Sequence, residues 1–135
     1  MVVLGNTMPP LIHWLNQLDG SSPSSSLMFL RNATWSLSNL FRYDTPMSNE
    51  ILLPTISTIS RLIFYPDEEV LIDVCWTLSY ISEHSFQVTH ILEAGILKRI
   101  VELTVHHNPG IQTPALRTIG NICGSGDIMH AQVLV

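Results

Sequence analysis

Two tryptophans and an arginine recur at a fixed interval along the 135-residue chain. Trp35, Trp76 and Arg117 are separated by 41 residues each time. An indole ring attracts a cation to its face by about 0.5–2 kcal/mol, and the alkyl stem of Lys or Arg packs well between two such rings. Repeated indoles on one surface would therefore select ligands that are rich in Lys and Arg.

A second set of residues follows the first at a distance of four. Asn39, Tyr80 and Asn121 occupy these positions, and residues four apart lie on one face of a helix. An amide side chain offers a donor and an acceptor, so it can bind the N–H and C=O of an extended peptide together. The pattern predicts a surface that holds a peptide backbone whatever its sequence.

Acidic residues near the second tryptophan fit the same interpretation. Asp73 lies three residues before Trp76, and Glu69 and Glu83 fall near the same stripe by helical spacing. These carboxylates are expected to pair with ammonium groups of a ligand. The net charge of −5 also favours a basic partner over nucleic acid or anionic lipid.

The elements that position these residues are predicted from an internal repeat. The segments RNATWSLSNL (31–40), DVCWTLSYIS (73–82) and PALRTIGNIC (114–123) echo one another, with a period typical of HEAT and armadillo arrays. Apolar residues recur in them at helical spacing, which places Trp35 away from the core. The predicted core faces are Leu30, Ala33, Leu37 and Leu40, then Val70, Val74, Leu78 and Ile81, then Leu116, Ile119 and Cys123. Both cysteines, Cys75 and Cys123, are expected to be buried, reduced thiols.

Shorter apolar segments upstream complete each unit. We expect helices over 11–18, 56–64 and 96–105, and a third short helix over 86–94 that ends in a sharp turn at Gly95. Three helices per unit favour an armadillo repeat over the two-helix HEAT form. The expected loops contain Gly, Pro, Ser and Asp, and lie at 20–26, 43–46, 65–67 and 108–110.

The predicted fold is an all-α, right-handed armadillo solenoid of about three repeats, truncated at both ends. The predicted segments are 1–10, the end of a preceding repeat; 11–42, 46–83 and 86–124, the three repeats; and 125–135, the start of a further repeat. Uncapped solenoid ends expose apolar surface, so we expect marginal stability or self-association of the isolated chain.

The quoted segments, together with ILEAGILKRIVEL at 91–103, resemble consecutive armadillo units of the importin-alpha family, the adaptors that carry nuclear cargo. The resemblance implies that Trp35, Asn39 and Trp76 belong to a major peptide-binding groove. Asn32 and Asp73 are at positions that assist it. Tyr80, Arg117 and Asn121 match the stretch where the groove passes toward a minor site. The predicted peptide-binding residues are Asn32, Trp35, Asn39, Asp73, Trp76, Tyr80, Arg117 and Asn121.

The same resemblance implies a nuclear import receptor for Lys/Arg-rich localisation peptides, found in cytoplasm and nucleus. Importin-beta would be a partner of a full-length relative, although its binding segment is not found here. We expect no cofactor, no metal, no nucleic-acid partner and no membrane insertion. No arrangement typical of a catalytic site can be placed in one pocket, so we expect no enzyme activity. Two alternatives stay open: an armadillo scaffold for other extended peptides, usually acidic ones, and a regulatory subunit of an enzyme.

Overall fold

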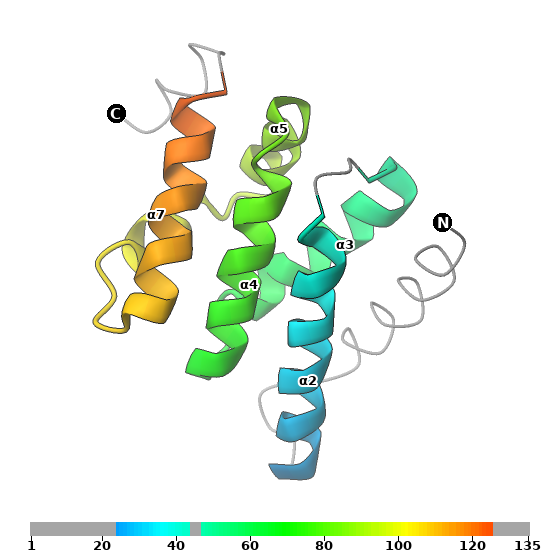
Figure 1. The fold of residues 1–135 in the computed structure, drawn as a ribbon, viewed down its shortest axis with the longest axis vertical. Helices are drawn as coiled ribbons and strands as arrows, with labels where there is room; N and C mark the ends of the chain where they lie inside the picture. Colours follow the sequence, from blue (N-terminus) through cyan, green and yellow to red (C-terminus); the bar gives the residue numbers. More distant parts are fainter. Residues whose placement is uncertain (1–23, 44–46, 126–135) are drawn as a thin grey trace.

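The computed structural model describes residues 24–43 and 47–125. These residues form helices and no strands. Three roughly parallel helices, α2, α4 and α7, stand side by side in one layer (Figure 1). Helices α3, α5 and α6 lie behind this layer. The bounds are α2 Ser24–Phe41, α3 Asn49–Leu62, α4 Glu68–Ile81, α5 Ser85–Glu93, α6 Leu97–Leu103 and α7 Pro109–Cys123. The predicted all-α solenoid is confirmed.

Apolar faces of the helices meet in one core between the two layers. Leu30 and Leu37 of α2 are almost fully buried, and so is the whole predicted face of α4. Burial of such side chains typically contributes about 1.5–3 kcal/mol each. The predicted core faces of α2 and α4 are therefore correct, with Leu40 at the partly buried edge.

The predicted core face of α7 is wrong for Leu116 and Cys123, whereas Ile119 is partly buried against the core. Leu116 is 52% exposed and Cys123 is exposed. Leu116 is equivalent to Thr34 and Cys75, which are both buried. Helices α2 and α4 are each followed by a neighbouring long helix that covers this flank, whereas the described residues place no such helix beyond α7. The core side of α7 is instead formed by Ile111, Pro114, Ala115, Thr118 and Ile122.

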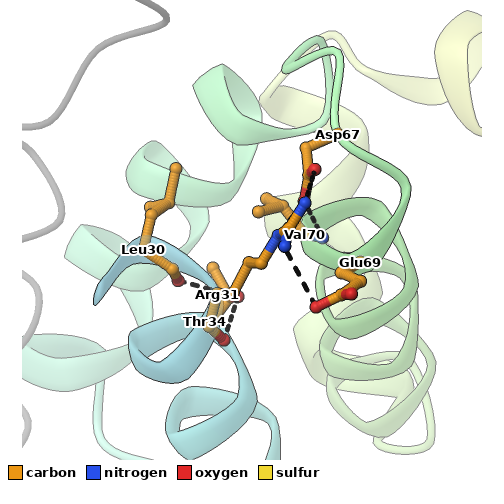
Figure 2. Close-up of polar contacts among 6 residues, drawn as sticks. All are labelled: Leu30, Arg31, Thr34, Asp67, Glu69 and Val70. Atoms are coloured by element: carbon orange, nitrogen blue, oxygen red, sulfur yellow. Dashed lines mark hydrogen bonds and ion pairs between the residues drawn. The ribbon is translucent and has the colours of Figure 1, made fainter. Parts of the chain in front are cut away.

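Polar caps fix where α4 and α7 begin. The carboxylate of Asp67 accepts a hydrogen bond from the backbone N–H of Val70 at 3.1 Å, and Asn108 accepts one from Gly110 at 2.8 Å. Such caps satisfy N–H groups that the helix itself leaves unpaired. Arg31 of α2 reaches across to Asp67 through two hydrogen bonds of 2.7 and 3.1 Å (Figure 2). The cap of α4 therefore also joins two neighbouring helices.

Three of the predicted boundaries need correction. Residues 24–26, predicted as loop, form the first turn of α2, which is compatible with the preference of serine for helix N-termini. Pro109 and Gly110, also predicted as loop, open α7, since proline suits the first helical position. In the unit at 46–83 the helix predicted over 56–64 is α3, which begins earlier and ends sooner, at Asn49–Leu62, and the unit has two helices. The unit at 86–124 has the predicted three.

The turn at Gly95 is as predicted. Its φ of +74° is the only positive φ among the described residues, and glycine adopts this conformation without the clash of a Cβ atom. It allows the chain to reverse between α5 and α6. No helix in the described part of the chain is long and apolar enough to span a bilayer. The predicted helix over 11–18 and the segments 1–10 and 126–135 lie outside the described residues.

Candidate peptide-binding groove

The exposed surface of α2, α4 and α7 is hollowed into a groove of about 570 Å³. It contains both recurring tryptophans, and neither of them belongs to the hydrophobic core. Each of the three long helices contributes side chains, so the groove crosses two junctions between neighbouring units. Its lining residues are Trp35, Ser38, Asn39, Arg42, Asp73, Trp76, Tyr80, Glu83 and Arg117.

Trp35 is the more exposed of the two groove tryptophans. Its side chain is 61% exposed, and no ring or guanidinium of the described residues stacks on it. Its carbonyl accepts hydrogen bonds from Ser38 Oγ at 2.7 Å and from Asn39 Nδ2 at 3.2 Å. The Oδ1 atom of Asn39 has no partner in the described part of the chain, so it is available to accept a peptide N–H.

Trp76 is more enclosed than Trp35. It is half-buried, and its ring centroid lies 5.9 Å from that of Tyr80 at an interplanar angle of 30°. The guanidinium carbon of Arg117 lies 6.0 Å from the Trp76 centroid. This distance is within the range of a cation–π contact. A cation of the chain itself therefore already rests on the second indole.

Glu83 fixes that arginine in place. Its Oε1 atom accepts a hydrogen bond from Nη2 of Arg117 at 2.7 Å. Glu69, which was also expected to meet a ligand, lies 3.5 Å from Arg31, and it does not line the groove. Both carboxylates thus have internal partners, which the sequence pattern did not predict.

Asp73 differs from these two acids. It lines the groove, is half-buried, and its carboxylate has no hydrogen bond or ion pair with any described residue. Burial raises the pKa of the Asp73 carboxyl to about 6, and the nearby charge of Glu69 adds to the increase. A cation placed beside Asp73 would stabilise its carboxylate and so offset the free-energy cost of burying that charge. The groove therefore holds one acid that is set up to receive a positive charge.

The two remaining predicted residues lie outside this set. Asn32 is exposed on α2, one turn before Trp35, but does not line the groove. Asn121 lines an adjacent polar pocket of about 350 Å³, with Gly120 and Gly124 among its neighbours. Its Nδ2 atom donates to the Ser79 carbonyl and to Ser82 Oγ, both at 3.1 Å. The donors of Asn121 are therefore used to join α7 to α4.

Comparison with known families agrees with this architecture. The model of the Armadillo/beta-catenin-like repeat matches residues 87–124, which contain α5, α6 and α7. Residues 87–124 therefore form an armadillo repeat.

Similar proteins extend the match to the rest of the armadillo chain. Importin subunit alpha-3 of Arabidopsis thaliana is 39% identical over 99% of this chain, and importin subunit alpha-1a of Oryza sativa is 40% identical over all of it. Importin subunit alpha-B of Dictyostelium discoideum is 47% identical over 69% of the chain. The resemblance seen in the sequence is confirmed. The chain spans 24% of the length of the two plant relatives and 18% of the third.

Solved structures show the same fold. A designed armadillo repeat protein in complex with the peptide (KR)4 superposes with a TM-score of 0.76 at 20% identity, covering 97% of this chain and 52% of the other. A second design, made for modular peptide recognition, gives a TM-score of 0.76 at 21% identity and covers 98% of this chain and 53% of its own. At these identities the similarity concerns the fold.

Sequence reasoning missed one recurring feature of the helices that carry the tryptophans. Ser38 and Ser79 are 41 residues apart, and each donates its hydroxyl to the carbonyl of the tryptophan on its own helix at 2.7 Å. The repeated Trp-x-Leu-Ser pattern at Trp35 and Trp76 carried this signal. No group of three or more His, Cys, Asp or Glu side chains suited to a metal ion occurs among the described residues.

Proposed function

We propose that this armadillo chain is a receptor module for Lys/Arg-rich nuclear localisation peptides and acts in protein import into the nucleus. The observation that carries the proposal is the groove that brings together Trp35, Trp76 and the unpaired carboxylate of Asp73. Aromatic faces and a half-buried acid form a surface suited to long cationic side chains. Similarity to importin alpha subunits over the whole chain supports the same ligand class.

The peptide would bind as an extended chain across α2 and α4. Lys or Arg stems would pack against the indole rings, with one cationic head near Asp73. The Oδ1 of Asn39, which no described residue uses, would accept a backbone N–H of the peptide. The helix uses only one N–H of this amide, so the other could donate to a peptide carbonyl. The designed armadillo protein that binds (KR)4 illustrates that this fold can hold an alternating basic peptide.

The proposal also sets where the protein acts. A receptor of this kind would meet cargo in the cytoplasm and release it in the nucleus. It binds its ligand without chemical change, so the proposed role is that of an adaptor and not of an enzyme.

A fluorescent Lys/Arg-rich peptide titrated against the chain tests the proposal. Anisotropy should rise with saturation for the wild-type protein, and the double change Trp35→Ala with Trp76→Ala should abolish the rise. Phe64→Ala is the matched control, because Phe64 is also 61% exposed but does not line the groove. Salt should weaken binding, since the contacts include partly exposed charges.

An acidic peptide of equal length separates the proposal from the scaffold alternative. Arg42 and Arg117 also line the groove, so an acidic ligand would have charged partners there. Preference for the acidic peptide, or unchanged binding of the basic peptide by the double variant, would reject the proposed function.

A further inference from the structure

The contact between Arg117 and Trp76 places a side chain of the protein where a ligand cation would sit. The guanidinium carbon lies 6.0 Å from the indole centroid. Arg117 projects from α7, whereas Trp76 belongs to α4, so the contact crosses a junction between units. An arginine in this position competes with any ligand cation for the same ring face.

Glu83 forms an ion pair with the arginine that contacts Trp76. The ion pair of 2.7 Å joins Arg117 to a carboxylate that is only 28% exposed, whereas the guanidinium side chain is 50% exposed. Glu83 lines both the groove and the adjacent polar pocket that contains Asn121. The ion pair therefore stands at the boundary between the two hollows, and the ring-lined part of the surface ends there.

Arg42 shows what an arginine does in the same groove without such a partner. It lines the groove from the end of α2 and is exposed. The described residues provide no ion pair and no ring contact for its side chain. Arg117 differs from Arg42 in having an acidic partner within the groove, Glu83.

We propose that Glu83 is a positioning residue which holds Arg117 over Trp76, so that the protein itself occupies this ring and limits the run of basic residues that the groove accepts. The inference rests on the proposed function. It specifies the ligand class further: Lys and Arg are favoured up to Trp76, and a residue without positive charge is favoured beyond it, where Arg117 and the polar pocket lie.

Two basic peptides, one with four and one with eight consecutive Lys/Arg residues, test this limit by anisotropy. Each variant is described by the ratio of its affinities for the long and the short peptide. Arg117→Ala should raise this ratio about 3- to 10-fold over wild type, the effect of one added cation–π contact. Lys98→Ala removes a positive charge from an exposed position outside the groove, so the ratio should change less than about 2-fold.

Glu83→Gln tests the positioning role. It should raise the ratio less than Arg117→Ala does, and it should add nothing in the Arg117→Ala background, because Glu83 acts through Arg117. Glu83→Asp, which keeps the carboxylate, should restore part of the wild-type ratio. Glu102→Gln is the control for charge, since Glu102 forms an ion pair with Arg99 at 3.4 Å on α6, outside the groove.

The indole N–H resonance of Trp76 provides a readout that needs no peptide. It should shift in Glu83→Gln and in Arg117→Ala and stay in place in Glu102→Gln. Loss of affinity for both peptides in Arg117→Ala, or an unchanged ratio, would overturn the limit on basic residues. If the wild-type chain binds neither peptide, the proposed function fails, and an unshifted Trp76 resonance would then separately refute the positioning of Arg117 by Glu83.

Discussion

The junction between α2 and α4 and the junction between α4 and α7 follow the same repeat plan but differ on their groove side. At the first, Trp35 is 61% exposed and its ring is open to a ligand. At the second, Arg117 covers Trp76 and Asn121 bonds to the end of α4. The comparison teaches that the repeat fixes where the groove runs, while single side chains decide which part of it a ligand can enter.

The same two junctions also differ at the opposite end of the helices. The cap of α4, Asp67, is held by the guanidinium of Arg31 through two hydrogen bonds (Figure 2). The cap of α7, Asn108, donates to a carboxylate oxygen of Glu68 at 2.6 Å. A guanidinium–carboxylate pair with two hydrogen bonds fixes orientation more strongly than a single hydrogen bond from a neutral amide. At the helix ends far from the groove, the junction between α2 and α4 is therefore held more strongly than the junction between α4 and α7.

Replacement of the two tryptophans gives the largest expected difference between the junctions. Trp35→Ala should reduce affinity for a basic peptide about 10- to 100-fold and change stability by less than about 0.5 kcal/mol, because the ring is mostly exposed. Trp76→Ala should reduce affinity less and lower the free energy of unfolding by about 1–3 kcal/mol, since it also packs against Tyr80. Anisotropy and urea unfolding of both variants measure the two effects.

An equal loss of stability in the two tryptophan variants would break the comparison. It would mean that Trp35 packs against the protein as Trp76 does. Tyr43→Ala serves as a control for the loss of an exposed aromatic ring, because Tyr43 is 74% exposed.

Asp67→Ala should be the more damaging of the two cap replacements. It removes the cap of α4 and the partner of Arg31 together, so we expect a loss of about 1–2 kcal/mol in urea unfolding at pH 7. Hydrogen bonding to Arg31 holds the pKa of the Asp67 carboxyl below its ordinary value. Its contribution is therefore present above the ordinary pKa and is lost as the pH falls through the lower folded value. The difference in the free energy of unfolding between wild type and Asp67→Ala should be constant from pH 5 to 8 and should shrink only in stronger acid.

Asn108→Ala should have a smaller effect at the second junction. The variant loses the hydrogen bond to Gly110 and the link to Glu68, and we expect a cost of about 0.5–1 kcal/mol at pH 7. Asn108→Asp, which can still cap the helix but repels Glu68, separates the two contributions. A loss as large as that of Asp67→Ala would contradict the view that the first junction is tied more strongly.

Asp73→Asn gives the smallest and most specific change, because it alters the unpaired acid that lines the groove together with the two indoles. At pH 7.5 the variant should bind a basic peptide about 3-fold more weakly. The raised pKa means that wild-type Asp73 is largely protonated at pH 5, so the difference between the two proteins should vanish there. Anisotropy titrations at both pH values measure this.

Stability should change in the opposite direction for the same variant. A carboxyl whose folded pKa is raised to about 6 destabilises the folded state progressively from its ordinary pKa up to pH 6, and fully above that. Asp73→Asn should therefore melt at a slightly higher temperature than wild type at pH 7.5 and at the same temperature at pH 4. A lower melting temperature at pH 7.5 would show that the carboxylate has a stabilising partner.

Much of the fold was predictable because it depends on local patterns that repeat. Helical spacing at Leu30 and Leu37 and the 41-residue interval from Trp35 to Trp76 indicate the long helices and the face that each buries. Gly95 indicates its own turn. The face of α7 was not predictable in this way, since exposure of Leu116 depends on whether another helix follows.

The sequence by itself determined the helices, their period and the residue types that reach the groove, because these follow from spacing along one chain. Only the tertiary structure decided which of those side chains are already paired. Glu83 and Arg117 are 34 positions apart, and their contact at 2.7 Å exists because α7 packs beside α4. Asp73 has no such partner, and packing alone set its burial and its raised pKa. Pairing between distant side chains depends on three-dimensional distance, which periodicity does not encode.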